Sequence, residues 1–76
     1  MITVKLFGLL RIESGIKEKK LDAASVKEVL EDLAASGISR KDLDACLVLV
    51  NGEGANKRTK LYDGDTVVLM SPVAGG

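Results

Sequence analysis

Only one segment of this chain has the apolar repeat of an amphipathic helix, which limits the folds open to it. Four apolar residues recur there at intervals of three and four: Val26, Val29, Leu30 and Leu33. Such spacing places them on one side of a helix. Ser25, with Glu28 three residues later, is typical of a capping box at a helix start, and Gly37 suits the left-handed residue that follows a helix end. We therefore predict one main helix over Ser25–Ala35.

Most other apolar residues follow strand patterns. The stretch Met1–Phe7 alternates apolar with other residues, and Ile16–Leu21 carries lysines that suit an edge strand. Apolar residues follow one another in Cys46–Val50 and in Thr66–Ser71, as in strands with two apolar faces. The order predicts an α+β fold with a mixed four- to five-stranded sheet, in which Met1–Phe7 and Thr66–Ser71 are adjacent and parallel at the centre.

The connecting segments are predicted from their turn residues. We expect a turn-like piece over Leu9–Ser14, between two glycines, and a short helical turn over Ser39–Asp42. Asn51-Gly52 is a hairpin turn pair, Gly54–Lys60 is polar and irregular, and Leu61–Asp65 is a turn. A single helix covers only one face of such a sheet, so we expect either loops or an exposed apolar patch, typical of a partner site, on the other.

Composition excludes several kinds of protein. The chain has no His, one Cys, two aromatic residues and a formal net charge of zero, which argues against nucleic-acid binding, disulfides and metal or iron–sulfur centres. No apolar run is long enough to span a bilayer, and the alternating residues 1–5 are not typical of a signal peptide, so we expect a cytoplasmic protein without a membrane role. We expect Cys46 to be shielded and chemically quiet, because no His is present to activate it. No nucleophile is paired with a base, so we expect no catalysis by the chain alone.

The last five residues, Pro72–Gly76, are the most informative. A glycine pair has the least side-chain bulk, so Gly75-Gly76 can pass through a narrow channel into another enzyme's active site, where the terminal carboxylate would react. A frayed terminus is the alternative explanation. We predict a domain over residues 1–72 and a flexible Gly-Gly tail over residues 73–76.

Four segments together resemble the ubiquitin-like sulfur carriers of the β-grasp fold, nearest to the small subunit of molybdopterin synthase (MoaD) and related to the thiazole-pathway carrier (ThiS). The segments are Val4–Arg11 with the following Gly15, Val50–Glu53, Leu61–Asp65 and Pro72–Gly76. Three departures stand beside the likeness. Ile12 replaces a frequent Glu, Ser71 replaces the first residue of a frequent Pro-Pro, and Gly54–Lys60 lacks the usual apolar residue.

The resemblance implies a ubiquitin-like β-grasp domain that acts through its terminus. An adenylating (E1-like) enzyme would bind the sheet and use ATP to activate the Gly76 carboxylate, and a sulfur donor acting through that partner would leave a thiocarboxylate. Residues Pro72, Val73, Ala74 and Gly75 would thread into the partner's active site. The molybdopterin synthase large subunit would then receive the sulfur, and the carrier would hold no cofactor stably. Three alternatives remain open: a ubiquitin-like modifier joined to lysines through Gly76, a sulfur carrier for thiamine thiazole synthesis, and a plain interaction domain whose tail does not react.

Overall fold

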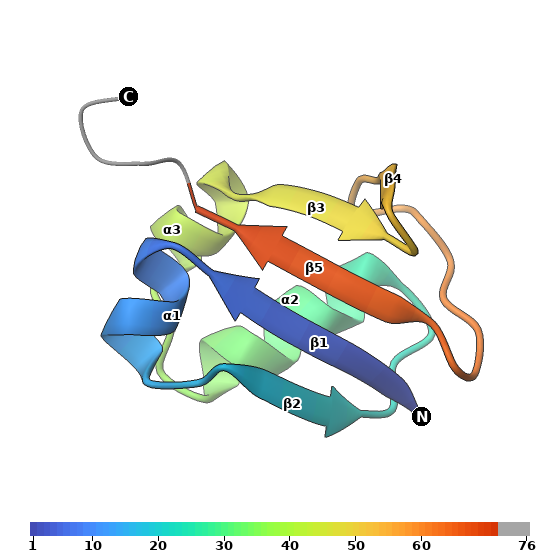
Figure 1. Ribbon diagram of the computed structural model, residues 1–76, viewed down its shortest axis with the longest axis horizontal. Coiled ribbons are helices and arrows are strands. Elements are labelled where there is room, and N and C mark those ends of the chain that lie inside the picture. Colours follow the sequence, from blue (N-terminus) through green and yellow to red (C-terminus); the bar gives the residue numbers. More distant parts are fainter. Residues whose placement is uncertain (72–76) are drawn as a thin grey trace.

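Two strands from opposite ends of the chain lie side by side in the middle of the sheet. The computed structural model describes residues 1–71, in which β1 (Ile2–Phe7) pairs in parallel with β5 (Thr66–Met70). Figure 1 shows this pair flanked by antiparallel neighbours, in the order β2-β1-β5-β3-β4. The predicted α+β class and the central parallel pair are confirmed.

The outer strands are short. They are β2 (Glu18–Leu21), β3 (Leu47–Val50) and β4 (Glu53–Gly54). The β3–β4 hairpin turns through Asn51 and Gly52, whose φ angles of 50° and 84° match the type I′ turn that this residue pair favours. Strands β2, β3 and β5 are each shorter than predicted, by one or two residues at one end.

The main helix, α2 (Val26–Ala35), begins as the capping residues predict. The Ser25 hydroxyl accepts a hydrogen bond from the Glu28 amide at 3.4 Å. The Glu28 carboxylate also turns back, but it accepts from the Ala24 amide at 3.2 Å instead of the expected Ser25 amide. The first contact satisfies an amide that a helix start leaves without a partner, and the second holds the residue before the cap.

The end of α2 is a Schellman motif. The Gly37 amide donates to the Ala34 carbonyl at 3.1 Å, and the Ile38 amide donates to the Leu33 carbonyl at 3.2 Å. Gly37 has a φ of 104°, which side chains with a Cβ rarely adopt. The predicted role of this glycine is confirmed.

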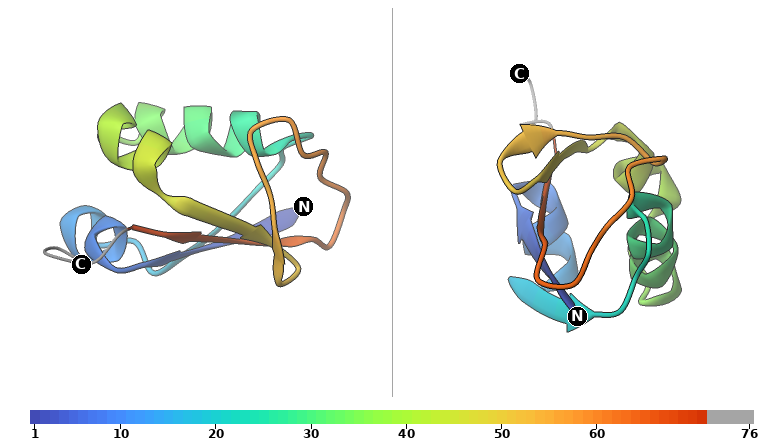
Figure 2. Two further views of the ribbon diagram at one scale, coloured as in Figure 1. Left: turned by 90° about the horizontal axis from the view of Figure 1, so that it is seen from above. Right: turned by 90° about the vertical axis from the view of Figure 1, so that its right-hand side faces the viewer.

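The core lies between α2 and one face of the sheet. In Figure 2, α2 and the short helix α3 (Arg40–Ala45) lie on the same side of the sheet. Val29, Leu30 and Leu33 join the strand residues in one buried cluster, as predicted. Its members are Ile2, Val4, Leu6, Leu10, Leu21, Val26, Val29, Leu30, Leu33, Leu43, Val48, Leu61, Val67 and Leu69.

One element was predicted wrongly. Residues Leu9–Ser14 form a helix, α1, instead of a turn. Leu10 is buried in the core, the Ser14 hydroxyl donates to the Leu10 carbonyl at 2.6 Å, and left-handed Gly15 closes the end. Six residues are too few to show a helical repeat, so tertiary packing of Leu10 decides the conformation.

Three further predictions concern the second short helix, the domain boundary and membrane-spanning segments. The second short helix exists, but it covers Arg40–Ala45 instead of Ser39–Asp42. The predicted boundary between domain and tail, after residue 72, lies outside the described residues. Within residues 1–71 no helix is long and apolar enough to cross a membrane.

Candidate functional site

The uncovered face of the sheet carries a group of apolar side chains. Strand pairing sets Met70 beside Phe7 on one side and beside Leu47 on the other, and the next row joins Val68 to Leu49. We call these five residues the apolar face. Leu47, Met70 and Phe7 are 56%, 41% and 40% exposed, which is high for large apolar side chains.

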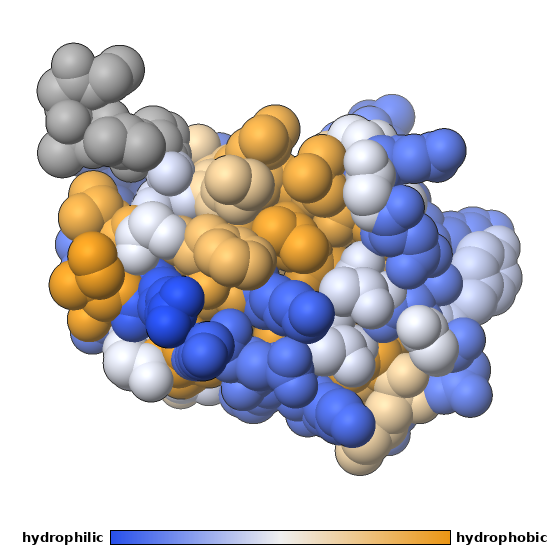
Figure 3. All heavy atoms as spheres, in the orientation of Figure 1, coloured by the Kyte–Doolittle hydropathy of each residue, from blue (hydrophilic) through white to orange (hydrophobic). Residues whose placement is uncertain are grey.

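Alternation along the strands explains this face. In β5, Val67 and Leu69 are fully buried against α2, so Val68 and Met70 must point to the opposite side. In Figure 3, apolar residues cover the sheet over β5 and β3, while hydrophilic residues cover the side of β2. The exposed patch expected from a sheet with one covering helix is therefore present.

The apolar face ends where the described chain ends. Ser71 follows Met70, and its hydroxyl accepts a hydrogen bond from the Leu10 amide at 3.2 Å, at the start of α1. Leu9 and Ile12 on this helix are also exposed, Ile12 by 76%. The predicted reactive residue Gly76 and the threading residues 72–75 lie outside the described residues. They follow directly from this corner of the sheet in sequence.

Cys46 is less shielded than predicted. It is half-buried at the end of α3 and packs against the core. Its thiol donates to the Leu43 carbonyl at 2.9 Å, and burial raises the pKa of the thiol. A raised pKa lowers the fraction of reactive thiolate at neutral pH. Its chemical quietness stays a prediction.

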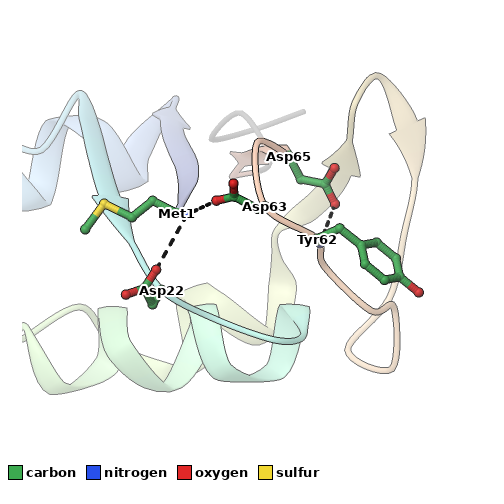
Figure 4. Close-up of polar contacts among 5 residues, drawn as sticks. All are labelled: Met1, Asp22, Tyr62, Asp63 and Asp65. Carbon is green, nitrogen blue, oxygen red and sulfur yellow. Dashed lines mark hydrogen bonds and ion pairs between the residues drawn. The ribbon is translucent and has the colours of Figure 1, made fainter.

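Acidic residues gather at the opposite end of β1, where they make turn contacts. Figure 4 shows the Met1 amino group against carboxylates of Asp63 and Asp22, the latter at 3.6 Å. Asp65 accepts from the Tyr62 amide at 2.8 Å and from the Asn51 side-chain amide at 2.9 Å. These two hydrogen bonds lower the pKa of Asp65. The contacts support the turn interpretation of Leu61–Asp65.

Polar groups elsewhere in residues 1–71 make structural contacts. In the part of the chain that the structure describes, no three His, Cys, Asp or Glu side chains are placed to hold a metal ion. Lys57, from the basic Lys57, Arg58 and Lys60 cluster, pairs with Asp44 at 2.9 Å. This pair ties the loop after β4 to α3. Among residues 1–71, we take the apolar face beside Ser71 as the candidate site.

Sequence reasoning missed the contact between Ser71 and α1. Ser71 was noticed only as a residue standing in place of a proline. Its partner, the Leu10 amide, lies 61 positions away. No local pattern connects the two, because the pairing of β1 with β5 brings them together.

Solved structures resemble this one closely. Small archaeal modifier protein 1 from Methanosarcina acetivorans is 26% identical with a TM-score of 0.79, over 99% of this chain and 95% of that chain. In the complex of subunits 1 and 2 of molybdopterin-converting factor from Helicobacter pylori, the matching chain is 28% identical with a TM-score of 0.75, over 99% and 97%. In the BexX/CysO complex of Amycolatopsis orientalis, the values are 27% and 0.73, over the whole of both chains.

These likenesses confirm the predicted ubiquitin-like β-grasp fold and the resemblance to ubiquitin-like sulfur carriers. No curated protein matches the chain significantly in sequence. The model of the ThiS family matches residues 4–76, which is nearly the whole chain and includes the terminal glycine pair. The chain belongs to the ThiS family.

Proposed function

We propose that this protein carries sulfur on its C-terminal glycine and delivers it for molybdopterin synthesis. The observation that carries the proposal is the family match, which continues through Pro72 to Gly76 and so includes the residues that would react. The likeness to a chain of the Helicobacter pylori molybdopterin-converting factor complex supports this choice of pathway.

Both reaction steps involve the terminal carboxylate of Gly76. The carboxylate attacks the α-phosphorus of ATP, which releases pyrophosphate and leaves an acyl-adenylate. A hydrosulfide-level sulfur donor then attacks the acyl carbon, AMP leaves, and a proton is lost to give the thiocarboxylate. The adenylating partner binds the ATP and the carrier binds no cofactor. The thiocarboxylate sulfur is the nucleophile delivered to the pterin precursor on the synthase large subunit.

The apolar face has the composition of a docking surface for these partners. Leu47, Met70 and Phe7 offer exposed apolar area at one end of the three middle strands, and the neighbouring pair Lys5 and Glu18 lies toward β2. A small apolar centre with a charged border suits partners that must bind in turn and separate again. Docking here would hold the partner next to Ser71, from which residues 72–76 continue.

The direct test is the intact mass of the protein after incubation with ATP, sodium sulfide and the E1-like enzyme of the same organism. We expect a species heavier by the difference between sulfur and oxygen. Deletion of Gly76 or a Gly75→Leu substitution should abolish it. Glu31→Leu is the matched control, because it adds the same side chain at an exposed position of α2, on the side of the sheet opposite the apolar face. Full sulfur loading of the shortened protein would overturn the proposal.

A second function, attachment to lysines of other proteins, is favoured by the likeness to a small archaeal modifier protein. It requires the same adenylation, so the products distinguish the two. Conjugates of higher mass that are cleaved at an isopeptide bond would favour the modifier.

The thiazole pathway is tested with the sulfur-loaded carrier. Transfer of sulfur to a purified thiazole synthase, but not to the molybdopterin synthase large subunit, would favour a role in thiazole synthesis.

A further inference from the structure

The first turn of α1 takes its cap from a distant part of the chain. Ser, Thr, Asp or Asn at the N-cap usually accepts a hydrogen bond from the second or third helical amide. In α1 the N-cap is Gly8, which has no side chain, and Leu10 is the second helical residue. The Ser71 hydroxyl accepts a hydrogen bond from the Leu10 amide at 3.2 Å, which is the bond that an N-cap side chain would otherwise accept.

Gly8 leaves room for this hydroxyl. A Cβ at position 8 would lie 2.6 Å from the Ser71 Oγ and 3.2 Å from the Ser71 carbonyl oxygen. Contacts below 3.0 Å are essentially absent for real Cβ atoms, so a side chain here would displace Ser71. Gly8 also has a φ of 69°, which favours glycine independently. Gly8 and Ser71 therefore fit each other as a pair.

Backbone contacts hold Ser71 from a second direction. The last register pair of the parallel strands joins Phe7 to Met70. Beyond it, the Ser71 amide and hydroxyl both lie 3.5 Å from the Phe7 carbonyl oxygen, at the long limit for a hydrogen bond. The shorter bond to Leu10 is thus the main side-chain restraint on the residue from which the tail departs.

We propose that Ser71 is a positioning residue for the reaction at Gly76. This inference rests on the proposed function, because it concerns how the reacting carboxylate is presented. Gly76 is the fifth residue after Ser71, so the carboxylate can lie up to roughly 17 Å from this anchor. Because the hydrogen bond holds Ser71 against α1, the residue that precedes the tail has a fixed position beside the apolar face.

Loss of the hydroxyl should lower the rate of reaction and leave docking intact. The apolar face is made by other residues, so the KM for the carrier should stay unchanged. Without this hydrogen bond, Ser71 would be held less firmly against α1. A smaller fraction of docked molecules would then place Gly76 at the reacting distance. If the net free energy of one hydrogen bond is lost from the reacting complex, kcat should fall roughly threefold to tenfold.

The experiment measures ATP–pyrophosphate exchange by the E1-like enzyme of the same organism, as a function of carrier concentration. The carriers are the unchanged protein, Ser71→Ala, Ser71→Thr and Ser25→Ala. Threonine restores the hydroxyl. Ser25→Ala removes a hydroxyl cap of the same kind from a different helix, α2, and so matches the loss of stability while Ser71 keeps its hydroxyl. Hydrogen exchange of the Leu10 amide reports whether the cap is lost.

We expect faster exchange at Leu10 and a lower kcat at unchanged KM for Ser71→Ala. Ser71→Thr should be close to the unchanged protein in both, and Ser25→Ala should keep the full kcat. An unchanged kcat in Ser71→Ala, or an equal fall in Ser25→Ala, would overturn the positioning role while the proposed function stands. Absence of ATP–pyrophosphate exchange with the unchanged protein would instead overturn the proposed function, and this inference with it.

Discussion

Leu30 and Leu47 have the same side chain in opposite environments, and their replacement by alanine separates stability from partner binding. Leu30 lies in the core on α2 and is 5% exposed, whereas Leu47 lies on the apolar face and is 56% exposed. The two substitutions remove identical atoms. Any difference in their effects therefore reports the surroundings of each leucine.

The different burial of the two leucines predicts different losses of unfolding free energy. Removing a buried leucine costs about 2–5 kcal/mol, because transfer energy is lost and a cavity remains. A domain of this size has a total stability of roughly 4–11 kcal/mol, so Leu30→Ala should remove a large part of it. Complete burial of a leucine is worth about 1.5–3 kcal/mol. Leu47 is more than half exposed and leaves no cavity, so Leu47→Ala should cost at most about 1 kcal/mol.

Urea unfolding followed by far-ultraviolet circular dichroism measures both values, since the chain has no Trp and a single Tyr. The slope against urea should be the same for all three proteins, so that midpoints compare stabilities. Equal losses in the two variants, or a near-neutral Leu30→Ala, would refute the placement of α2 over the core.

The same pair should behave in the opposite order toward a partner. Leu47→Ala should raise the KM for the carrier in adenylation at least fivefold, if Leu47 lies at the centre of the interface. Leu30→Ala, assayed at a temperature where it remains folded, should keep the KM of the unchanged protein. An unchanged KM in Leu47→Ala would remove Leu47 from the docking surface.

Three further outcomes test other parts of the structure. Native Cys46 should react with a thiol reagent more slowly than the urea-unfolded chain, because burial raises its pKa; equal rates would reopen a reactive role. Asp65 has a pKa below its ordinary value of 3.8, so its charged form favours the folded state. Its contribution is therefore present above that value and lost as pH falls through the lowered pKa. Asp65→Asn should accordingly reduce stability at neutral pH and much less in acid, whereas a deficit independent of pH would contradict this sign. Gly52→Ala should cost about 1 kcal/mol in urea unfolding, because its φ of 84° is unfavourable for alanine; no loss would argue against the tight hairpin turn.

Much of the secondary structure could be predicted from local patterns in the sequence. The spacing of apolar residues and the caps at Ser25 and Gly37 predicted α2 within one residue of its observed start. Asn51-Gly52 predicted the turn that ends β3. These features depend on hydrogen bonds and φ angles within a few residues, so a sequence read in order contains them.

The tertiary structure alone decided three other features. Residues Leu9–Ser14 became helical because Leu10 packs into the core, which a six-residue pattern does not reveal. The choice of the exposed face depended on the side that α2 covers, since β3 and β5 are apolar on both sides. The contact of Ser71 with the Leu10 amide joins residues 61 positions apart. Composition and spacing encode local conformation and the amount of apolar surface, whereas the pairing of β1 with β5 selects which distant groups meet.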